Sequence, residues 1–402
     1  MTLPLRVALL GLGTVGAQVA RGLTHDGARL AASSGGRELR LVVVADPDPD
    51  RPQGVDLEGI ERVADGGAVV ARRDIDVVVE LIGGTGIAGD LVVRAIQSGT
   101  SVVTANKALL ARRGAELERL AREQGVALRF EAAVGGGIPI LAPLGGDLAA
   151  NRFDRVRGIV NGSTNYVLTA LHDGAESYEA AVAKARALGY LEADPRTDIE
   201  AADAADKLTI LARVAFGAWP DVTAIRRAPP ALTGDGPPGI AGVSAALVDA
   251  ARRNGLTMKL VADGARRPDG RIAASVLPCA VPSGWPLART SGVENRIELE
   301  GEPIGRLAFA GPGAGGAATS SAILGDLLAL ARGEGSTWAG LAGAGPLAAG
   351  LLDDGLEHER RWLRLDSSGQ ARVTGRTTLA ELRRATPAGT GPVVFFPILD
   401  EA

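Results

Sequence analysis

The chain has 402 residues, with 43 Lys and Arg against 47 Asp and Glu and a formal net charge of -4. A chain of this length can bury two or three domain cores, and without a basic run it lacks the positive surface that a nucleic-acid backbone requires. The single cysteine excludes a disulfide framework and a thiolate-bound metal. No apolar stretch reaches the roughly 18 residues of a membrane span. We therefore expect a soluble protein of the reducing cytoplasm with neither a nucleic acid nor a membrane as partner.

The first third of the chain alternates strand-like and helix-like segments. Apolar runs predict strands over 5–10, 38–45, 76–82, 101–104 and 126–131, and helical periodicity predicts helices over 14–23, 88–98 and 108–124. Such alternation is typical of a parallel, doubly wound sheet. The predicted fold class is therefore α/β, starting with a Rossmann-type domain.

From about residue 140 the pattern becomes mixed α+β. We expect strands over 155–160, 258–262, 271–278 and 295–300, and helices over 163–171, 178–188, 198–216 and 243–253, with a Pro- and Gly-rich loop over 228–239. Thr197 and Glu200 have the spacing of a capping box and would start the long helix over 198–216.

The C-terminal tail, 334–402, has strand patterns over 361–365, 371–373 and 393–398 and a helical pattern over 378–384. Four short elements cannot easily bury a core of their own. We therefore expect this short α/β tail to pack onto its own dimer or to pair with a second copy of itself.

A glycine loop, Gly11-Leu12-Gly13-Thr14-Val15-Gly16, directly follows the first apolar strand and opens a helix. In this position the glycines permit a tight turn and a close approach of the backbone to a pyrophosphate at the helix N-terminus. Asp46, at the end of the second strand, can accept hydrogen bonds from a ribose. The loops after the next two strands, with Gly84 and Thr85 and with Lys107, should lie beside the same dinucleotide.

Only four of the 43 basic residues are lysines, and one of them, Lys207, follows Asp203 by four positions. The same helical face continues with apolar residues, which favours a cleft over an exposed salt bridge. Three more acids precede the pair: Glu192, Asp194 and Asp198. Acids around a lysine suit the ammonium group of an amino-acid substrate whose hydroxyl or carbonyl meets Lys207.

Taken together, these motifs resemble the homoserine dehydrogenase family. The similar segments are the glycine loop at 11–16, TANKAL at 104–109, FEAAVGGGIPI at 130–140, NGSTNYVL at 161–168, the stretch 189–211, GLTMKL at 255–260 and GPGAGG at 311–316. They cover about the first 330 residues in the family's order. One departure is the pair Ala201 and Ala202, where the family often has a glycine before Asp203, and it concerns the local backbone shape.

The resemblance implies reversible, NAD(P)-dependent interconversion of L-homoserine and L-aspartate 4-semialdehyde, on the route to threonine, methionine and isoleucine. It implies that Lys207 and Lys107 are catalytic. The implied substrate-binding residues are Glu192, Asp198, Asp203, Tyr190 and Thr164. The implied cofactor-binding residues are Gly11, Gly13, Thr14, Val15, Gly16, Asp46, Gly84, Thr85, Lys107, Gly189 and Gly311. Oxygens of Glu131, Val134, Gly136 and Ile138 would hold a monovalent cation, usually sodium.

The expected domains are a dinucleotide-binding domain of residues 1–140 and 306–333, a catalytic and dimerisation domain of 141–305, and the tail as an ACT-like remnant. We expect a homodimer or a tetramer. Acids after the second strand, among them Asp48 and Asp50, favour NAD over NADP because they would repel a 2′-phosphate. Two alternatives are a catalytically silent NAD(P)-binding sensor and a semialdehyde dehydrogenase of another type, which would need Cys279 as its nucleophile.

Overall fold

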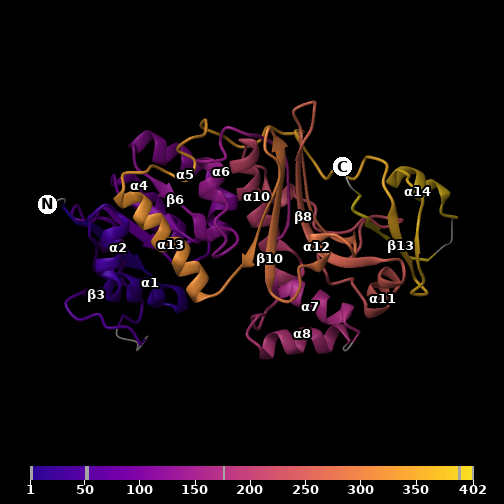
Figure 1. Cartoon of the computed structure of the whole chain (residues 1–402), viewed down its shortest axis with the longest axis horizontal. Helices are drawn as coiled ribbons and strands as arrows, with labels where there is room; N and C mark the ends of the chain where they lie inside the picture. Colours follow the sequence, from indigo (N-terminus) through magenta and orange to yellow (C-terminus); the bar gives the residue numbers. More distant parts are fainter. Residues whose placement is uncertain (1–2, 50–53, 175–176, 388–390, 401–402) are drawn as a thin grey trace. The chain divides into compact units, whose positions relative to one another are not determined.

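The computed structural model describes residues 3–49, 54–174, 177–387 and 391–400 (Figure 1). The chain forms two compact units. Unit 1 consists of residues 1–152, 210–219 and 312–346, and unit 2 consists of 153–209, 220–311 and 347–402.

Unit 1 contains a six-stranded parallel sheet in the order β3-β2-β1-β4-β5-β6. Its strands are β1 (Leu5–Leu10), β2 (Leu39–Ala45), β3 (Glu61–Val63), β4 (Val77–Glu80), β5 (Ser101–Thr104) and β6 (Leu128–Arg129). The order runs outward from β1 in both directions, so the strand order reverses between β1 and β4. In an open α/β sheet, the crevice at the carboxyl ends of these two strands is where ligands bind. The predicted Rossmann-type fold is therefore confirmed.

The helices of unit 1 are α1 (Thr14–His25), α2 (Gly27–Ser33), α3 (Gly66–Val70), α4 (Ile87–Gln97), α5 (Lys107–Gln124), α6 (Leu141–Gly145) and α13 (Gly316–Ala331), with the 3-10 turn η1 (Glu131–Ala133). Although α13 comes late in the chain, it packs along α1 (Figure 1). Apolar residues of α1, α13, β1 and β2 form one buried cluster. The first domain is thus completed by a distant segment of the sequence.

Unit 2 contains a six-stranded mixed sheet in the order β11-β10-β7-β8-β9-β12. Its strands are β7 (Arg152–Ile159), β8 (Leu256–Arg266), β9 (Ile272–Pro282), β10 (Glu294–Glu302), β11 (Gly305–Pro312) and β12 (Leu352–Asp353). Its helical elements include α7 (Gly162–His172), α8 (Tyr178–Ala187), η2 (Val222–Ala224), α11 (Ala245–Arg253) and α12 (Pro286–Arg289). The expected mixed α+β arrangement after residue 140 is confirmed, with β8 and β9 longer than the sequence pattern indicated.

The expected single helix over 198–216 is wrong. The segment forms two helices, α9 (Arg196–Ile199) and α10 (Ala202–Phe216), separated by Ala201 in a left-handed conformation with φ 64°. The expected capping box is absent from α9, whose N-cap is Pro195 without a side-chain hydrogen bond. The break has a tertiary cause, because the backbone amide of Ile240 donates to the carbonyl of Ile199 at 2.9 Å and holds the turn.

The tail folds as β13 (Trp362–Asp366), β14 (Ala371–Val373), α14 (Leu379–Ala385) and β15 (Val393–Pro397). The three strands are antiparallel, with β13 in the centre. Trp362, Val393 and Phe395 of the tail share a buried cluster with Val261 of β8 and Leu277 of β9. The apolar side chains of the tail are therefore covered by the sheet of the same chain. Among the described helices, none has the length and apolarity needed to cross a membrane.

Candidate functional site

The glycine loop has the geometry that a dinucleotide requires. Gly11 has φ 97°, and a Cβ there would lie 2.8 Å from the carbonyl oxygen of Leu81. A Cβ on Gly16 would lie 2.1 Å from the oxygen of Gly11, whereas one on Gly13 would meet nothing within 4 Å. Gly11 and Gly16 are thus required for the tight turn. Gly13 leaves open space over the N-terminus of α1, where free backbone N–H groups suit phosphates.

The late glycine motif, GPGAGG at 311–316, returns to this loop. A Cβ on Gly316, at the start of α13, would lie 3.2 Å from the side chain of Thr14. A Cβ on Gly136 would lie 2.7 Å from the backbone of Gly313. Within unit 1 the structure therefore brings three glycine-rich segments together, as a site of close backbone approach to a ligand requires.

Asp46 is buried, and its carboxylate orders the glycine loop directly. One oxygen accepts from the backbone amide of Leu12 at 2.7 Å and the other from that of Asp48 at 3.0 Å. The acid expected to face the ribose therefore also holds the loop expected to face the phosphates. Asp50 lies outside the described residues.

A second buried acid, Glu80 at the end of β4, organises the next two loops. One carboxylate oxygen accepts from the amides of Ile82 and Gly83 at 2.9 and 2.8 Å, and the other accepts from the Thr104 hydroxyl at 2.6 Å. The Asn106 amide donates to the Gly84 carbonyl at 2.7 Å. These bonds join the loop that carries Gly84 and Thr85 to the start of α5, whose first residue is Lys107.

Lys207 lies on α10 in unit 2 and is nearly buried, with 8% of its surface exposed. Its ammonium donates to the Val160 carbonyl at 2.6 Å and forms an ion pair with the Asp203 carboxylate at 2.8 Å. The pair is therefore buried, and the alternative of an exposed salt bridge is excluded. An ammonium has three N–H donors, and the contacts with Val160 and Asp203 use two of them.

Asn161 joins this pair to a second acid. Its side-chain amide donates to Asp198 at 2.6 Å and to Asp203 at 2.9 Å, while its oxygen caps α7 by accepting from the amide of Thr164. The Thr164 hydroxyl donates to the same oxygen at 2.9 Å. The structure therefore gathers Asp198, Asp203 and Lys207 around an asparagine to which sequence analysis assigned no role.

The other acids expected around Lys207 behave differently. Asp194 is exposed and pairs with Arg196 at 2.5 Å, so it does not face the lysine. Glu192 is exposed in the loop after α8. Tyr190, 39% exposed, packs edge-on against Tyr166 with 5.1 Å between ring centroids, and Gly189 has φ 75°. This loop therefore offers solvent-facing groups beside a buried lysine cluster.

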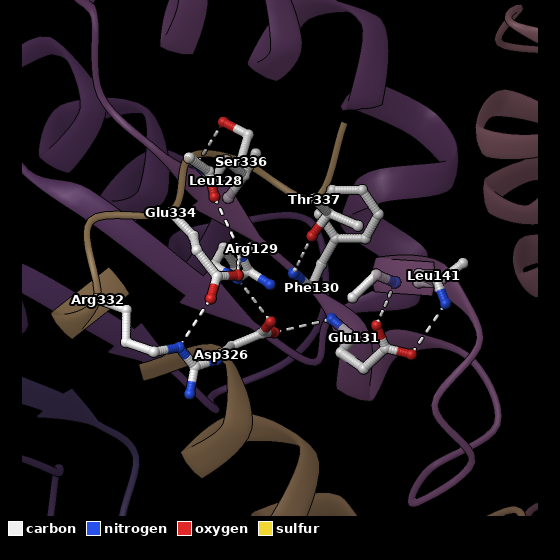
Figure 2. A network of polar contacts seen from close by, with 12 residues as sticks. Leu128, Arg129, Phe130, Glu131, Leu141, Asp326, Arg332, Glu334, Ser336 and Thr337 are labelled. Carbon is white, nitrogen blue, oxygen red and sulfur yellow. Dashed lines mark hydrogen bonds and ion pairs between the residues drawn. The ribbon is translucent and has the colours of Figure 1, made fainter. Parts of the chain in front are cut away.

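The segment proposed for a cation begins at Glu131 in unit 1 (Figure 2). Its carboxylate accepts from the backbone amides of Ile140, Leu141 and Ala142 at 2.6, 2.9 and 2.5 Å, and so caps α6. Burial and then the charge of Asp326 raise the pKa of Glu131 despite these bonds. Since the carboxylate is occupied, a cation here would be held by main-chain carbonyls. Oxygen donors of this kind fit a hard cation, and the described residues contain no cluster of three acidic, His or Cys ligands.

Cys279 does not have the properties of a nucleophile. It lies on β9 with 4% of its surface exposed, and burial raises the pKa of its thiol to about 12. A thiolate is therefore suppressed near neutral pH. This observation removes the basis for a thiol-dependent semialdehyde dehydrogenase.

The two residues that sequence analysis missed had readable signals. Glu80 ends an apolar strand, the same pattern that singled out Asp46 after β2. Asn161 directly precedes a helix, where asparagine is a favoured N-cap. The pattern could not show that the side-chain nitrogen of Asn161 donates hydrogen bonds to two acids that follow it by 37 and 42 residues.

Comparisons with known proteins agree with these observations. Residues 11–131 match the family model "Homoserine dehydrogenase, NAD binding domain", and residues 139–328 match the model "Homoserine dehydrogenase". The homoserine dehydrogenase of Corynebacterium glutamicum is 43% identical over 333 residues, which are 81% of this chain and 72% of that protein. That of Mycobacterium leprae has the same identity and coverage.

Solved structures extend the similarity to the whole chain. A homoserine dehydrogenase from Thiobacillus denitrificans superposes with a TM-score of 0.86 at 30% identity and covers 99% of both chains. A hyperthermophilic archaeal homoserine dehydrogenase in complex with NADPH has a TM-score of 0.66 at 27% identity, over 82% of this chain and 97% of that one. With a nicotinamide-binding Rossmann domain and these relatives, the chain belongs to the homoserine dehydrogenase family.

Proposed function

We propose that this protein oxidises L-homoserine reversibly to L-aspartate 4-semialdehyde with a nicotinamide dinucleotide, as a step toward threonine, methionine and isoleucine. The observation that carries the proposal is the buried Asp203–Lys207 pair, whose ammonium is fixed by the Asp203 carboxylate and the Val160 carbonyl. The lone, buried Cys279 is in keeping with a reducing cytoplasm as the place of action.

Lys207 is the proposed proton carrier. A nicotinamide dinucleotide held at the glycine loop would supply the acceptor for the hydride of the alcohol carbon of the substrate. The hydroxyl proton then passes to the neutral amine of Lys207, and in the reductive direction the ammonium returns it to the aldehyde oxygen. Asp203 and the Val160 carbonyl fix the amine in place, and Asn161 holds Asp203 in turn.

The substrate ammonium group is the proposed ligand of the acids. Glu192 provides an exposed carboxylate, Asp198 a half-buried one and Asp203 a buried one. Tyr190 would cover the substrate from the same loop. Thr164 would act through Asn161, because its hydroxyl is already engaged with that side chain.

The proposed cofactor-binding residues of unit 1 are Gly11, Gly13, Thr14, Val15, Gly16, Asp46, Gly84, Thr85 and Lys107, and those of unit 2 are Gly189 and Gly311. We favour NAD because Asp46 is a buried acid at the end of β2. We also propose that the main-chain oxygens of Glu131, Val134, Gly136 and Ile138 hold a monovalent cation. The test compares the turnover measured in sodium chloride with the turnover measured in tetramethylammonium chloride.

For the domains, we propose cofactor binding by residues 1–140 and 306–333, catalysis and dimerisation by 141–305, and an ACT-like remnant in 334–402. The proposed assembly is a homodimer or a tetramer.

The test is an absorbance assay of nicotinamide reduction with L-homoserine at alkaline pH, run with NAD+ and with NADP+. Lys207→Ala should lose about 10² to 10⁴ in turnover, the usual contribution of a general acid/base, while its affinity for the dinucleotide is unchanged. The matched control is Lys184→Ala on α8, which should retain wild-type turnover. Near-normal turnover of Lys207→Ala would reject the role of the lysine. No reduction by the wild-type protein would instead favour the silent sensor, and equal or better specificity constants with NADP+ would reject the preference for NAD.

A further inference from the structure

A cavity of about 240 Å³ lies within unit 2, away from the Lys207 cluster, and the tail forms part of its wall. Its lining contains five arginines: Arg155, Arg157, Arg267, Arg360 and Arg376. Two of them come from β7, one follows β8, and the last two belong to the tail. The cavity therefore concentrates guanidinium groups from segments far apart in the sequence.

The acids of the cavity wall do not balance these charges. Asp263 pairs with Arg157 at 3.0 Å and with Arg155 at 3.7 Å. Asp354 pairs with Arg226, which lies outside the wall. Asp400 is shared between Arg376 of the wall and Arg361 outside it, each at 2.8 Å. Only the exposed Glu359 remains. The wall thus keeps a surplus of positive charge.

Arg360 carries most of this surplus. In the part of the chain that the structure describes, it has no ion pair. One terminal nitrogen donates to the Gly355 carbonyl, the guanidinium lies 5.6 Å from the ring centroid of Trp362, and its Nε is buried without an acceptor. Burial lowers the pKa of this guanidinium; the charge of Asp263 raises it, and the charges of Arg155 and Arg267 lower it further. A buried cation that other cations repel is costly unless an anion joins it.

Among the described residues, Arg267 also has a buried nitrogen whose hydrogen-bonding capacity is not used. This nitrogen is Nε, which has no acceptor within the described ranges, and the ion pair of Arg267 with Asp353 is long, at 3.7 Å. Planar guanidinium groups bind carboxylate and phosphate oxygens with paired N–H donors, and several of them together suit a compact anion with more than one negative charge.

We propose that this cavity binds a small, multiply charged anion, either phosphate or a polycarboxylate, through Arg360, Arg267 and Arg155. The anion neutralises the arginine surplus and joins the tail to the strands β7 and β8. The site is independent of the proposed catalytic function, because it uses neither Lys207 nor the glycine loop.

The test is isothermal titration of the full-length protein with inorganic phosphate and, separately, with citrate, at constant ionic strength. Saturating NAD+ is present so that the phosphate site of unit 1 is filled. We expect saturable binding of one anion per chain, and the stronger of the two titrants identifies the class. Arg360→Met should weaken binding about tenfold or more, the loss of one charge-assisted hydrogen bond. The control Arg252→Gln, at an exposed pair with Asp249, should bind as wild type.

Two results would overturn the proposal: no saturable binding of either anion, or unchanged binding by Arg360→Met. The anion-free Arg360→Met protein should be at least as resistant to heat as wild type, because a buried charge without a counter-ion has been removed. If that variant does not fold, Arg267→Met decides by the same titration.

Discussion

Ala201 provides a direct test of the helix break that places Lys207. It is fully buried, it has φ 64°, and its carbonyl accepts from the Ala205 amide as the N-cap of α10. Alanine in the left-handed region costs about 1 to 2 kcal/mol, which a glycine would recover. Against this, glycine lowers the free energy of unfolding by about 0.4 to 1 kcal/mol, because it gives the unfolded chain more conformational freedom. Removing the buried methyl group costs about 0.8 kcal/mol. The three effects nearly cancel, so Ala201→Gly should leave the free energy of unfolding almost unchanged.

The matched control is Ala204→Gly, three residues later in α10 and only 2% exposed. At that position, in the helix interior, replacing alanine by glycine lowers the free energy of unfolding by about 1 kcal/mol through the poorer helix propensity. The loss of the buried methyl group lowers it by about 0.8 kcal/mol more. We expect Ala204→Gly to be destabilised by about 2 kcal/mol relative to Ala201→Gly. Urea unfolding followed by circular dichroism measures the difference, and homoserine oxidation reports whether Lys207 stays in place. Equal losses of stability in the two variants would show that Ala201 is not left-handed.

Two further predictions concern buried charges. In unit 1 the Glu118 carboxylate accepts two hydrogen bonds from the Arg213 guanidinium, at 2.6 and 2.7 Å. Glu118→Gln removes this negative charge from a buried guanidinium and should lower the free energy of unfolding by about 3 kcal/mol. Adding Arg213→Met should restore part of this loss in the same urea titration, and a further drop would contradict the reasoning. Burial lowers the pKa of Lys259 to about 8, whereas the unfolded side chain keeps its proton up to about 10.5. Because the unfolded chain then binds more protons, stability should rise as the pH increases from about 8 to 9, by at most about 1.4 kcal/mol per pH unit. Lys259→Met should lack that rise, and an identical pH dependence in both proteins would refute the assignment.

Local patterns in the sequence determined most of the first domain. Apolar runs bounded by turn residues located β1 and β5 to the residue, and the glycine loop was recognisable because its turn and helix start are encoded within six positions. The acids Asp46 and Glu80 also follow from a local rule, since each ends a buried strand. The short strand β3 and the helices α2 and α3 were missed, because their segments carry weak periodicity.

Only the tertiary structure decided the features that depend on distant segments. The break at Ala201 arises where the 239–240 segment binds Ile199, and helix periodicity alone favours an unbroken helix. The role of Asn161 requires Asp198 and Asp203 to fold against its side-chain amide. The fold also decides that Asp203 pairs with Lys207, whereas Asp194 is exposed and pairs with Arg196. The tail is likewise covered by β8 and β9, because Trp362 and Phe395 share one buried cluster with Val261 and Leu277, which lie far earlier in the sequence. Composition and spacing identify which groups are available, and contacts between remote segments determine which of them meet.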